Sequence, residues 1–193
     1  MRLLETIKVE NGEFQNLDFH QWRIDWSRKR LGFKDILKLS LPTPPKDEVF
    51  RCRIIYYKKI EKIEFIPYKK RELKRFSLAF SENIDYSLKY ENRDVFDSLK
   101  REFLNGNDEI VVVKNGLITD ISIANITFFD GEKWITPKTP LLQGTVRERF
   151  LREKKIFTAD IKVEDIWRFK KLGLINAMFG FQIVDGNISD IIS

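Results

Sequence analysis

Short apolar runs broken by turn dipeptides constrain the fold of this chain more than any other feature of its sequence. Asn11-Gly12, Asn115-Gly116 and Asp130-Gly131 interrupt such runs, and these dipeptides suit the positive backbone angles of tight hairpin turns. Asn105-Gly106 instead follows a segment with helical spacing, where it predicts a helix end. Strands and helices are thus mixed without strict alternation, which predicts an α+β fold rather than a doubly wound sheet.

The first half of the sequence predicts a small α/β subdomain over residues 1–81. Residues 2–16 read as a hairpin, and Asp18 can cap the helix that follows it. This helix carries aromatic bulk on one side and is expected to pack on the sheet; its aromatic residues are Phe19, Trp22 and Trp26. After the proline-rich residues 41–45, residues 50–56 alternate as a strand face, and further strand-like runs follow.

The second half predicts a larger, strand-rich subdomain over residues 82–193, with the boundary in the polar stretch 81–85. It begins with a helix, and a series of strands follows. Residues 145–154 have helical character, and residues 164–171 predict another short helix before Gly173.

The composition excludes several classes of protein. A single cysteine, Cys52, allows no internal disulfide and no CxxC metal pair, so no metal site is expected. No run approaches the roughly 20 apolar residues that span a bilayer, and the first residues lack the apolar core of a signal peptide. We therefore expect a cytoplasmic protein without membrane contact. The formal charge of +6 is interleaved with acidic residues, which favours a solvated surface over nucleic-acid binding.

Phosphate-loop, hydrolase-elbow and zinc-protease motifs do not occur in this sequence. Four other segments carry residues capable of chemistry: HQWR with Arg23, YSLKYENR with Lys89, ITDISIANITFF with Asp120 and Asn125, and LQGT with Gly144. Each alone has an ordinary explanation as a solvated lysine, a turn aspartate, or a glycine turn with a threonine cap. Their combination is the informative signal.

The order of these segments closely resembles class IV pyridoxal-phosphate enzymes. Nearly the whole chain takes part, through ETIKVENGEF, HQWR, KYENR, NGLITDISIANITFFDGEKWITP, LLQGTVRERF and LINAM. The family includes branched-chain and D-amino acid aminotransferases and aminodeoxychorismate lyase. The resemblance implies the fold-type IV architecture of the D-amino acid aminotransferases, pyridoxal 5'-phosphate as the cofactor, and a homodimer.

The resemblance places the Schiff base with the cofactor on Lys89, with Asn92 in the accompanying position of the KxxN segment. Lysine attacks an aldehyde only as a neutral amine, so this segment needs a desolvated or positively charged neighbourhood. Asp120 stands five residues before Asn125, where the family usually has a glutamate that contacts the pyridine nitrogen. A carboxylate there keeps that nitrogen protonated. Aspartate has a shorter reach, so we expect this contact to be altered or bridged by water.

The cofactor phosphate is expected to bind at the turn formed by Gly144, Thr145 and Val146, and to Arg23 from the small subdomain. Glycine lets the backbone approach an anion, a threonine hydroxyl can donate to it, and a helix N-terminus favours negative charge. Arg23 would add a charge-assisted pair. His20, the only histidine, is expected to have a packing or capping role on its aromatic-rich helix.

The sequence identifies candidate substrate-binding residues less clearly than cofactor-binding ones. Asn176 in LINAM matches a position near cofactor and substrate in the family, although core packing explains its neighbours equally well. Arg93 completes a KxxNR run that we associate with the lyases. Candidates for binding a substrate carboxylate are Arg51, Arg53 and Arg147.

The beginning of the chain departs from the family pattern. Relatives usually start with an additional strand and a DRGxxYGDGxFE segment, whereas this chain starts almost directly at LLETIKV, with Leu4 at the aromatic position of FE. We therefore expect substrate recognition to differ from the family more than cofactor binding does.

These residues support one main hypothesis and two alternatives. The main hypothesis is an aminodeoxychorismate lyase-like enzyme of folate biosynthesis, which releases 4-aminobenzoate and pyruvate. The first alternative is a class IV aminotransferase for branched-chain or D-amino acids, which would use the same residues. The second is a non-catalytic basic binding protein built on the same fold.

Overall fold

The structure, a computed structural model, describes residues 1–192, and the chain divides into two compact units. Unit 1 comprises Met1–Lys70 and Leu88–Asn92, and unit 2 comprises Arg71–Ser87 and the chain from Arg93 onwards. The sequence placed the boundary after residue 81, whereas here residues 71–81 lie in unit 2 and Lys89 lies in unit 1. Strand pairing explains both differences, because each of these segments hydrogen-bonds to a strand of the unit that contains it.

Unit 1 is a four-stranded antiparallel sheet in the order β2-β1-β3-β4. Its strands are β1 Leu3–Glu10, β2 Glu13–Phe14, β3 Phe50–Tyr56 and β4 Ile60–Pro67. The expected hairpin between β1 and β2 is confirmed, with Asn11 and Gly12 in its turn at φ values of 54° and 74°. The strand expected over residues 50–56 is also confirmed.

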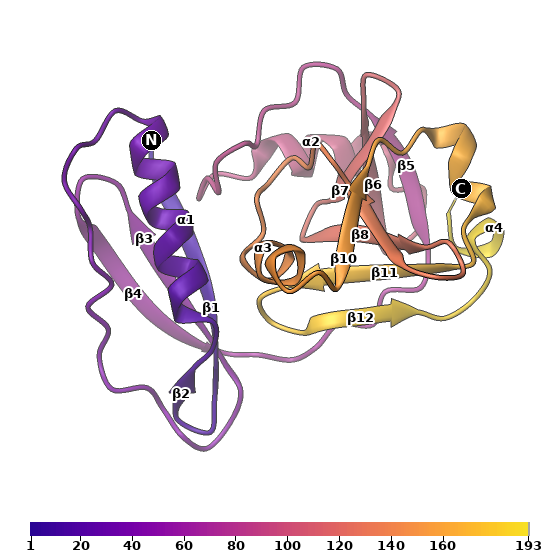
Figure 1. Ribbon diagram of the computed structural model, residues 1–193. Helices are drawn as coiled ribbons and strands as arrows, with labels where there is room; N and C mark the ends of the chain where they lie inside the picture. The colour runs from indigo at the N-terminus through magenta and orange to yellow at the C-terminus, as the bar shows by residue number, and fades with distance from the viewer. Residues whose placement is uncertain (193) are drawn as a thin grey trace. The chain divides into compact units, whose positions relative to one another are not determined.

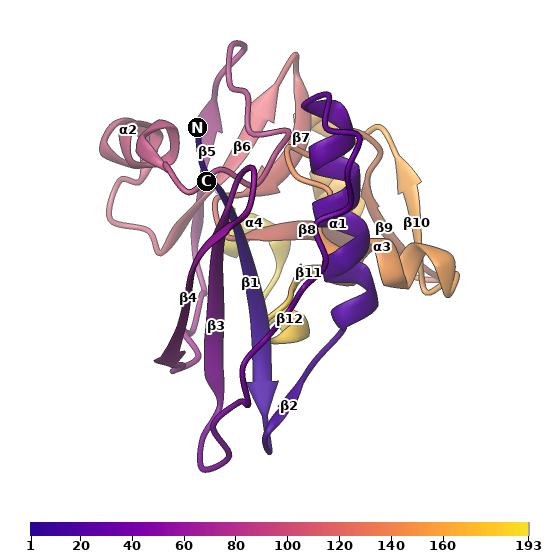
Figure 2. The same ribbon diagram turned by 90° about the vertical axis from the view of Figure 1, so that its left-hand side faces the viewer.

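Helix α1, Leu17–Arg30, lies against one face of this sheet (Figure 1, Figure 2). It begins after Asn16, so Asp18 lies in the first turn and is not the cap that the sequence predicted. Its buried residues recur at helical spacing and are mostly polar: His20, Arg23, Ile24, Ser27 and Arg28. The expectation that this helix packs on the sheet is confirmed, and its fully buried face is mostly polar rather than aromatic. Trp22 and Trp26 stack on each other, with ring centroids 6.4 Å apart, and stay half-buried.

Polar groups that leave water on folding need partners, and Arg28 shows how α1 obtains them. Its guanidinium donates to the carbonyl oxygens of Tyr57 at 2.5 Å and Lys58 at 3.2 Å, and to Asp35 at 2.6 Å. The first two bonds attach the last turns of α1 to the connection between β3 and β4. Unit 1 is thus held partly by buried polar contacts between its helix and its sheet.

Unit 2 is an eight-stranded mixed sheet (Figure 1). Six strands follow the order β10-β9-β8-β7-β6-β5, and β11 and β12 continue from the other edge of β8. The strands are β5 Phe76–Phe80, β6 Glu109–Lys114, β7 Leu117–Ile121, β8 Ala124–Phe129, β9 Trp134–Pro137, β10 Ile156–Ala159, β11 Lys171–Asn176 and β12 Gly180–Val184. The pairs β5–β6 and β9–β10 are parallel, so each needs a crossover connection. Helices α2 Asp94–Phe103 and α3 Thr145–Arg152 provide these crossovers.

The core of unit 2 is built mainly from β-branched and aromatic residues. Residues 110–113 of β6 are all fully buried, as expected for a strand in the interior of a sheet covered on both faces. The Asn115-Gly116 turn is confirmed, with φ values of 52° and 72°. The helix predicted to end near Asn105-Gly106 is present as α2 and ends at Phe103. The helix predicted over residues 145–154 is also present and ends at Arg152.

The end of unit 2 differs from the sequence-based expectation. The helix expected over residues 164–171 is a short 3-10 helix, η1 Val163–Arg168, and Lys171 already belongs to β11. Gly173, expected after the helix, lies inside β11. A side chain there would lie 2.9 Å from Thr127 and Trp134, so the glycine is explained by crowding. A four-residue helix, α4 Ile188–Ile191, follows β12.

The predicted α+β class is confirmed by the two sheets with helices interspersed among the strands. Within residues 1–192, no helix is long and apolar enough to cross a membrane.

We expect Gly173→Ala to lower the free energy of unfolding by about 1–3 kcal/mol, because the added methyl group overpacks the space beside Thr127 and Trp134. Urea denaturation followed by circular dichroism measures this change. Thr158→Ala, at an exposed position of β10, is the control and should change stability by less than about 0.5 kcal/mol. Equal stabilities of the two variants would contradict the crowding explanation.

Candidate functional site

The residues that the sequence predicted for the site fall into both units. Unit 1 contains Arg23, Lys89 and Asn92. Unit 2 contains the others: Arg93, Asp120, Asn125, Gly144, Thr145, Val146 and Asn176.

Lys89 lies in a short segment that pairs with the edge of β1 in unit 1. The Leu4 N–H donates to the Lys89 carbonyl oxygen at 2.8 Å, and the Glu91 N–H donates to the Arg2 carbonyl oxygen at 3.0 Å. Leu3 and Tyr90 form an antiparallel bridge between these bonds. The backbone of Lys89 is therefore fixed beside β1, and its side chain is half-buried. Asn92, three residues later, is exposed.

A buried polar cluster of Glu5, His20 and Arg23 joins β1 to α1. Arg23 donates to the Glu5 carboxylate through Nε at 2.8 Å and through Nη2 at 2.5 Å. His20 Nδ1 lies 2.6 Å from the same carboxylate. Glu5 and His20 are fully buried, and Arg23 is 4% exposed. Glu5 therefore neutralises a buried arginine and orients a buried histidine at the same time.

The charges of this cluster follow from its contacts. Burial alone raises the pKa of Glu5, but the Arg23 charge and the His20 hydrogen bond outweigh it and bring that pKa to about 2. Burial lowers the pKa of His20 against the opposing effect of Glu5, and the positive charges of Arg23 and, to a smaller extent, Lys89 lower it further. His20 is thus neutral and donates from Nδ1 to the ionised Glu5. Its Nε2 is buried and has no hydrogen-bond partner among the described residues.

The sequence motifs did not point to Glu5 as a partner of Arg23. The signal was present, because Glu5 shares a strand face with Leu3, Ile7 and Val9 by the two-residue period, and all of these are buried. A carboxylate on an apolar strand face needs a buried cation. Arg23, 18 residues away, provides it. The expected contact of Arg23 with a phosphate stays a prediction, while its bidentate bond to Glu5 shows how its guanidinium is held.

In unit 2, Asp120 and Asn125 face each other across the β7–β8 pair. Asn125 Nδ2 donates to Asp120 Oδ1 at 2.8 Å and to the Leu142 carbonyl oxygen at 2.9 Å. The Leu142 N–H donates to Asp120 Oδ2 at 3.0 Å. Burial raises the pKa of Asp120 to about 7, although the hydrogen bonds from Leu142 and Asn125 and the charge of Arg147 oppose this rise. Asp120 is therefore a carboxyl group that can exchange a proton near neutral pH.

The predicted phosphate turn leads directly into α3. Gly144 is the N-cap residue, and the Glu148 N–H donates to its carbonyl oxygen at 2.8 Å. Thr145 and Val146 are buried in the first turn. The first N–H groups of a helix have no partner within the helix, and the helix dipole adds positive potential there. The turn thus has the local geometry of an anion site.

Arg147 also lies in the first turn of α3 and is buried. Its guanidinium donates to the Pro137 carbonyl oxygen at 2.7 Å, to Gln143 Oε1 at 3.2 Å and to Thr136 Oγ1 at 3.4 Å. These contacts connect β9 to the turn before α3, which indicates a structural role. Of the three arginines considered for a substrate carboxylate, Arg51 and Arg53 on β3 are the better candidates, since both are only half-buried.

Arg93 and Asn176 both bind the backbone between β7 and β8. Arg93 Nη2 donates to the Ser122 carbonyl oxygen at 2.7 Å. Asn176 Nδ2 donates to the Ile123 carbonyl oxygen at 3.3 Å, while its Oδ1 accepts the N–H groups of Met178 and Phe179. These bonds shape the turn that follows Asp120. A contact of either residue with substrate stays a prediction.

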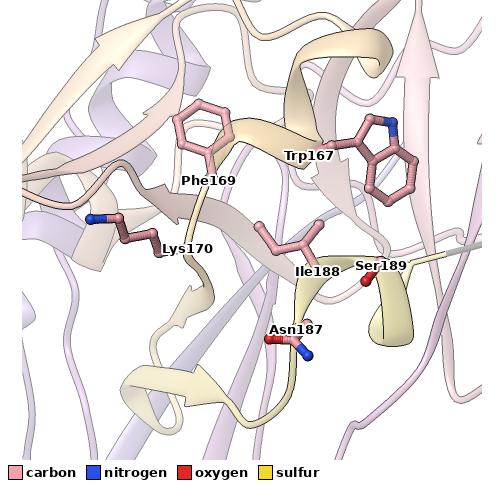
Figure 3. A pocket seen from close by; sticks show the side chains of 6 residues that line it. All are labelled: Trp167, Phe169, Lys170, Asn187, Ile188 and Ser189. Carbon is pink, nitrogen blue, oxygen red and sulfur yellow. The ribbon is translucent and has the colours of Figure 1, made fainter.

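A separate hollow of about 340 Å³ lies at the end of unit 2 (Figure 3). It is lined by residues around η1 and α4: Trp167, Phe169, Lys170, Asn187, Ile188 and Ser189. None of the residues that the sequence predicted for the site lines it. In the part of the chain that the structure describes, no group of three or more histidine, cysteine, aspartate or glutamate residues could hold a metal ion.

We expect Glu5→Gln to lower the free energy of unfolding at pH 7 by about 3–5 kcal/mol, because it leaves the Arg23 charge buried without a counter-charge. Wild-type stability should also fall as the pH drops from about 4.5 towards 2, since the Glu5 pKa is lowered in the folded state. This part of the pH dependence should be absent in Glu5→Gln. Urea denaturation at a series of pH values measures both effects.

Glu10→Gln is the matched control for Glu5→Gln. Glu10 lies on the same strand, and its side chain is 40% exposed in a pair with Lys8. Its substitution should change stability by less than about 1 kcal/mol. If both variants lost the same stability, compensation of the buried Arg23 charge by Glu5 would not contribute to the stability of unit 1.

Comparison with known proteins places this geometry in a family. The sequence pattern described as amino-transferase class IV matches residues 53–186. An uncharacterized protein of Haemophilus influenzae is 40% identical over 185 residues, which cover 92% of this chain and 98% of that protein. The crystal structure of a proposed 4-amino-4-deoxychorismate lyase from Haemophilus somnus is 34% identical, with a TM-score of 0.83 and coverage of 93% of this chain and 97% of that one.

A hypothetical aminotransferase of Mycobacterium tuberculosis, solved in a PLP-bound form, has a TM-score of 0.73 and covers 100% of this chain and 83% of that one. At 15% identity it shows a common fold alone. The fold is that of the fold-type IV pyridoxal-phosphate enzymes, which confirms the expected architecture. The chain therefore belongs to the class IV aminotransferase family, whose members are pyridoxal-phosphate-dependent lyases and aminotransferases.

Proposed function

We propose that this chain binds pyridoxal 5'-phosphate and that Lys89 is the residue that links to it covalently. The proposal is supported by the functional groups found around Lys89 in unit 1 and around the α3 N-terminus in unit 2. Lys89 lies in the segment that is hydrogen-bonded to β1, the strand that carries Glu5, and the buried Asp120 is bonded to the loop that leads into the α3 N-terminus. An amine, a cation, a helix N-terminus and a buried carboxyl group are the groups that this cofactor requires.

The phosphate would be held by Arg23 and by the turn of Gly144, Thr145 and Val146. Arg23 suits this role because Glu5 fixes its guanidinium with two hydrogen bonds, so little side-chain entropy is lost when an anion binds. The turn suits it because its backbone N–H groups lie at the start of α3.

When bound, the cofactor supplies an electron sink for the negative charge that develops at the substrate Cα. Lys89 Nζ, once released from its covalent link, would accept the Cα proton and return it later in the reaction. Asp120 would face the ring nitrogen, with Asn92 and Asn125 beside the cofactor. Since burial raises the Asp120 pKa to about 7, a positive ring nitrogen next to it would favour its ionised form.

Among the reactions of the family, we favour expulsion of a β-substituent, as in an aminodeoxychorismate lyase. Three observations support this choice. The Haemophilus somnus relative at 34% identity bears the name of a proposed 4-amino-4-deoxychorismate lyase. The KxxNR run includes Arg93, and Arg51 and Arg53 are partly exposed cations on β3 that suit an anionic substrate. Transamination of an amino acid is the second candidate, because it needs the same cofactor residues.

Purified wild-type protein incubated with pyridoxal 5'-phosphate should show the imine absorbance of a lysine-linked cofactor, and Lys89→Ala should abolish it completely while the protein stays folded. The reason is that no other amine can replace a lysine held at this position by β1. Absorbance spectroscopy and circular dichroism are the measurements. Lys62→Ala, an exposed lysine of the same unit, is the control and should keep the band. A wild type that takes up no cofactor would refute the proposal.

The reaction is tested by product analysis. With aminodeoxychorismate, the loaded enzyme should release pyruvate and 4-aminobenzoate in equal amounts without any added keto acid. Conversion of the cofactor to its amine form by an amino acid, with no pyruvate from aminodeoxychorismate, would instead establish the aminotransferase. The homodimer and the cytoplasmic location stay predictions from the sequence.

A further inference from the structure

Three hydrogen bonds in unit 2 close a ring around Leu142, which lies in the loop between β9 and α3. They join Asp120 Oδ2 to the Leu142 N–H, the Leu142 carbonyl oxygen to Asn125 Nδ2, and Asn125 Nδ2 to Asp120 Oδ1. Asp120 and Asn125 are 3% and 5% exposed, so water does not compete strongly for these bonds. The ring fixes the backbone two residues before the N-cap of α3.

Gly144 shows how closely the next part of the loop is pressed against this ring. A Cβ atom at Gly144 would lie 1.9 Å from Asn125 Oδ1. The φ of Gly144 is −72°, which other residues adopt without strain, so space and not backbone conformation requires glycine. The Asn125 amide also cannot be reversed, because its oxygen would then face the Leu142 carbonyl oxygen.

We propose that Asp120 is the positioning residue of the α3 N-terminus: through Leu142 and Asn125 it holds Gly144 and Thr145 in the conformation that receives a phosphate group. The proposal rests on the proposed function in one respect, namely that this turn receives the phosphate of the cofactor. It adds a second role to Asp120. The carboxylate accepts hydrogen bonds from the loop and from Asn125, and these leave part of its lone-pair capacity for a ligand.

This role explains why aspartate occurs where the family usually has glutamate. Asp120 and Asn125 are directly opposite in the strand register, and the Leu142 N–H lies within reach of the short side chain. An additional methylene group in so buried a place would push the carboxylate past these donors or displace the loop. Aspartate thus fits the loop, whereas a residue selected only for contact with a ring nitrogen could equally be glutamate.

The decisive variants are Asp120→Glu and Asp120→Asn, with Asp108→Asn as the matched control. Asp108 also accepts two backbone N–H groups in unit 2, from Lys74 at 2.8 Å and Arg75 at 3.0 Å, but in exposed surroundings. Two properties of the cofactor-free protein are measured: the affinity for inorganic phosphate by titration calorimetry, and the hydrogen-exchange rate of the Leu142 amide by NMR. Uptake of the cofactor is followed separately through its absorbance.

Both Asp120 variants should weaken phosphate binding by about tenfold and speed the exchange of the Leu142 amide by a similar factor, the size expected when one buried hydrogen bond is lost. Asp108→Asn should leave both values unchanged. Gly144→Ala leaves Asp120 intact but displaces Asn125, and it should give the same two changes. It serves as the second test if an Asp120 variant does not fold.

Asp120→Glu with wild-type phosphate affinity and wild-type protection of Leu142 would overturn the positioning role. A wild type that binds no phosphate would overturn it as well. The two proposals fail separately. Phosphate binding that depends on Asp120, without any lysine-linked cofactor, would refute cofactor binding alone. Normal cofactor uptake with an insensitive Leu142 amide would refute the positioning role alone.

Discussion

The buried ion pair between Glu5 and Arg23 is the interaction on which unit 1 depends most. It connects the central strand β1 to α1, the unit's only helix among the described residues, at a place where Glu5 is fully buried and Arg23 is nearly so. Such a pair gains little net stability over an apolar contact, yet removal of one partner is costly because the other charge stays buried. The main effect of the pair is therefore to fix the position of the Arg23 guanidinium. His20, bonded to the same carboxylate, adds a neutral group to this environment.

In unit 2, too, a buried carboxyl group joins two segments that lie far apart in the sequence. Asp120 is buried on β7, and its bonds reach a loop that is 22 residues later in the sequence. Arg147 fixes the other side of this loop by bonds to Pro137, Thr136 and Gln143. The start of α3 is thus shaped by side chains from the sheet and from the helix itself. Helix N-termini commonly bind anions. In this protein the contacts of Asp120 and Arg147 restrict the conformation of the loop that leads into the α3 N-terminus.

The local features of the fold were predictable because they depend on neighbouring residues. The Asn11-Gly12 and Asn115-Gly116 turns follow from the tolerance of asparagine and glycine for positive φ. Helix α2 follows from the spacing of its apolar residues. The region around η1 was predicted wrongly as a longer helix. The local sequence up to Lys171 is compatible with either a helix or a strand, and the pairing of β11 with β8 stabilises the strand that begins at Lys171. The polar character of the buried face of α1 could not be predicted for a similar reason, since burial of α1 is governed by its partners Glu5 and the β3–β4 turn.

The sequence by itself determined the family, the α+β class and the identity of the candidate residues, because motif order and local periodicity are properties of the chain alone. Only the tertiary structure decided which groups those residues contact. Glu5 meets Arg23 across 18 residues, Asp120 meets Leu142 across 22, and Asn176 meets Ile123 across 53. Contacts of this kind depend on strand register and helix placement. Burial raises the pKa of both Glu5 and Asp120, and only the contacts with Arg23 and His20 reverse this shift for Glu5, so the opposite net shifts exist only after folding.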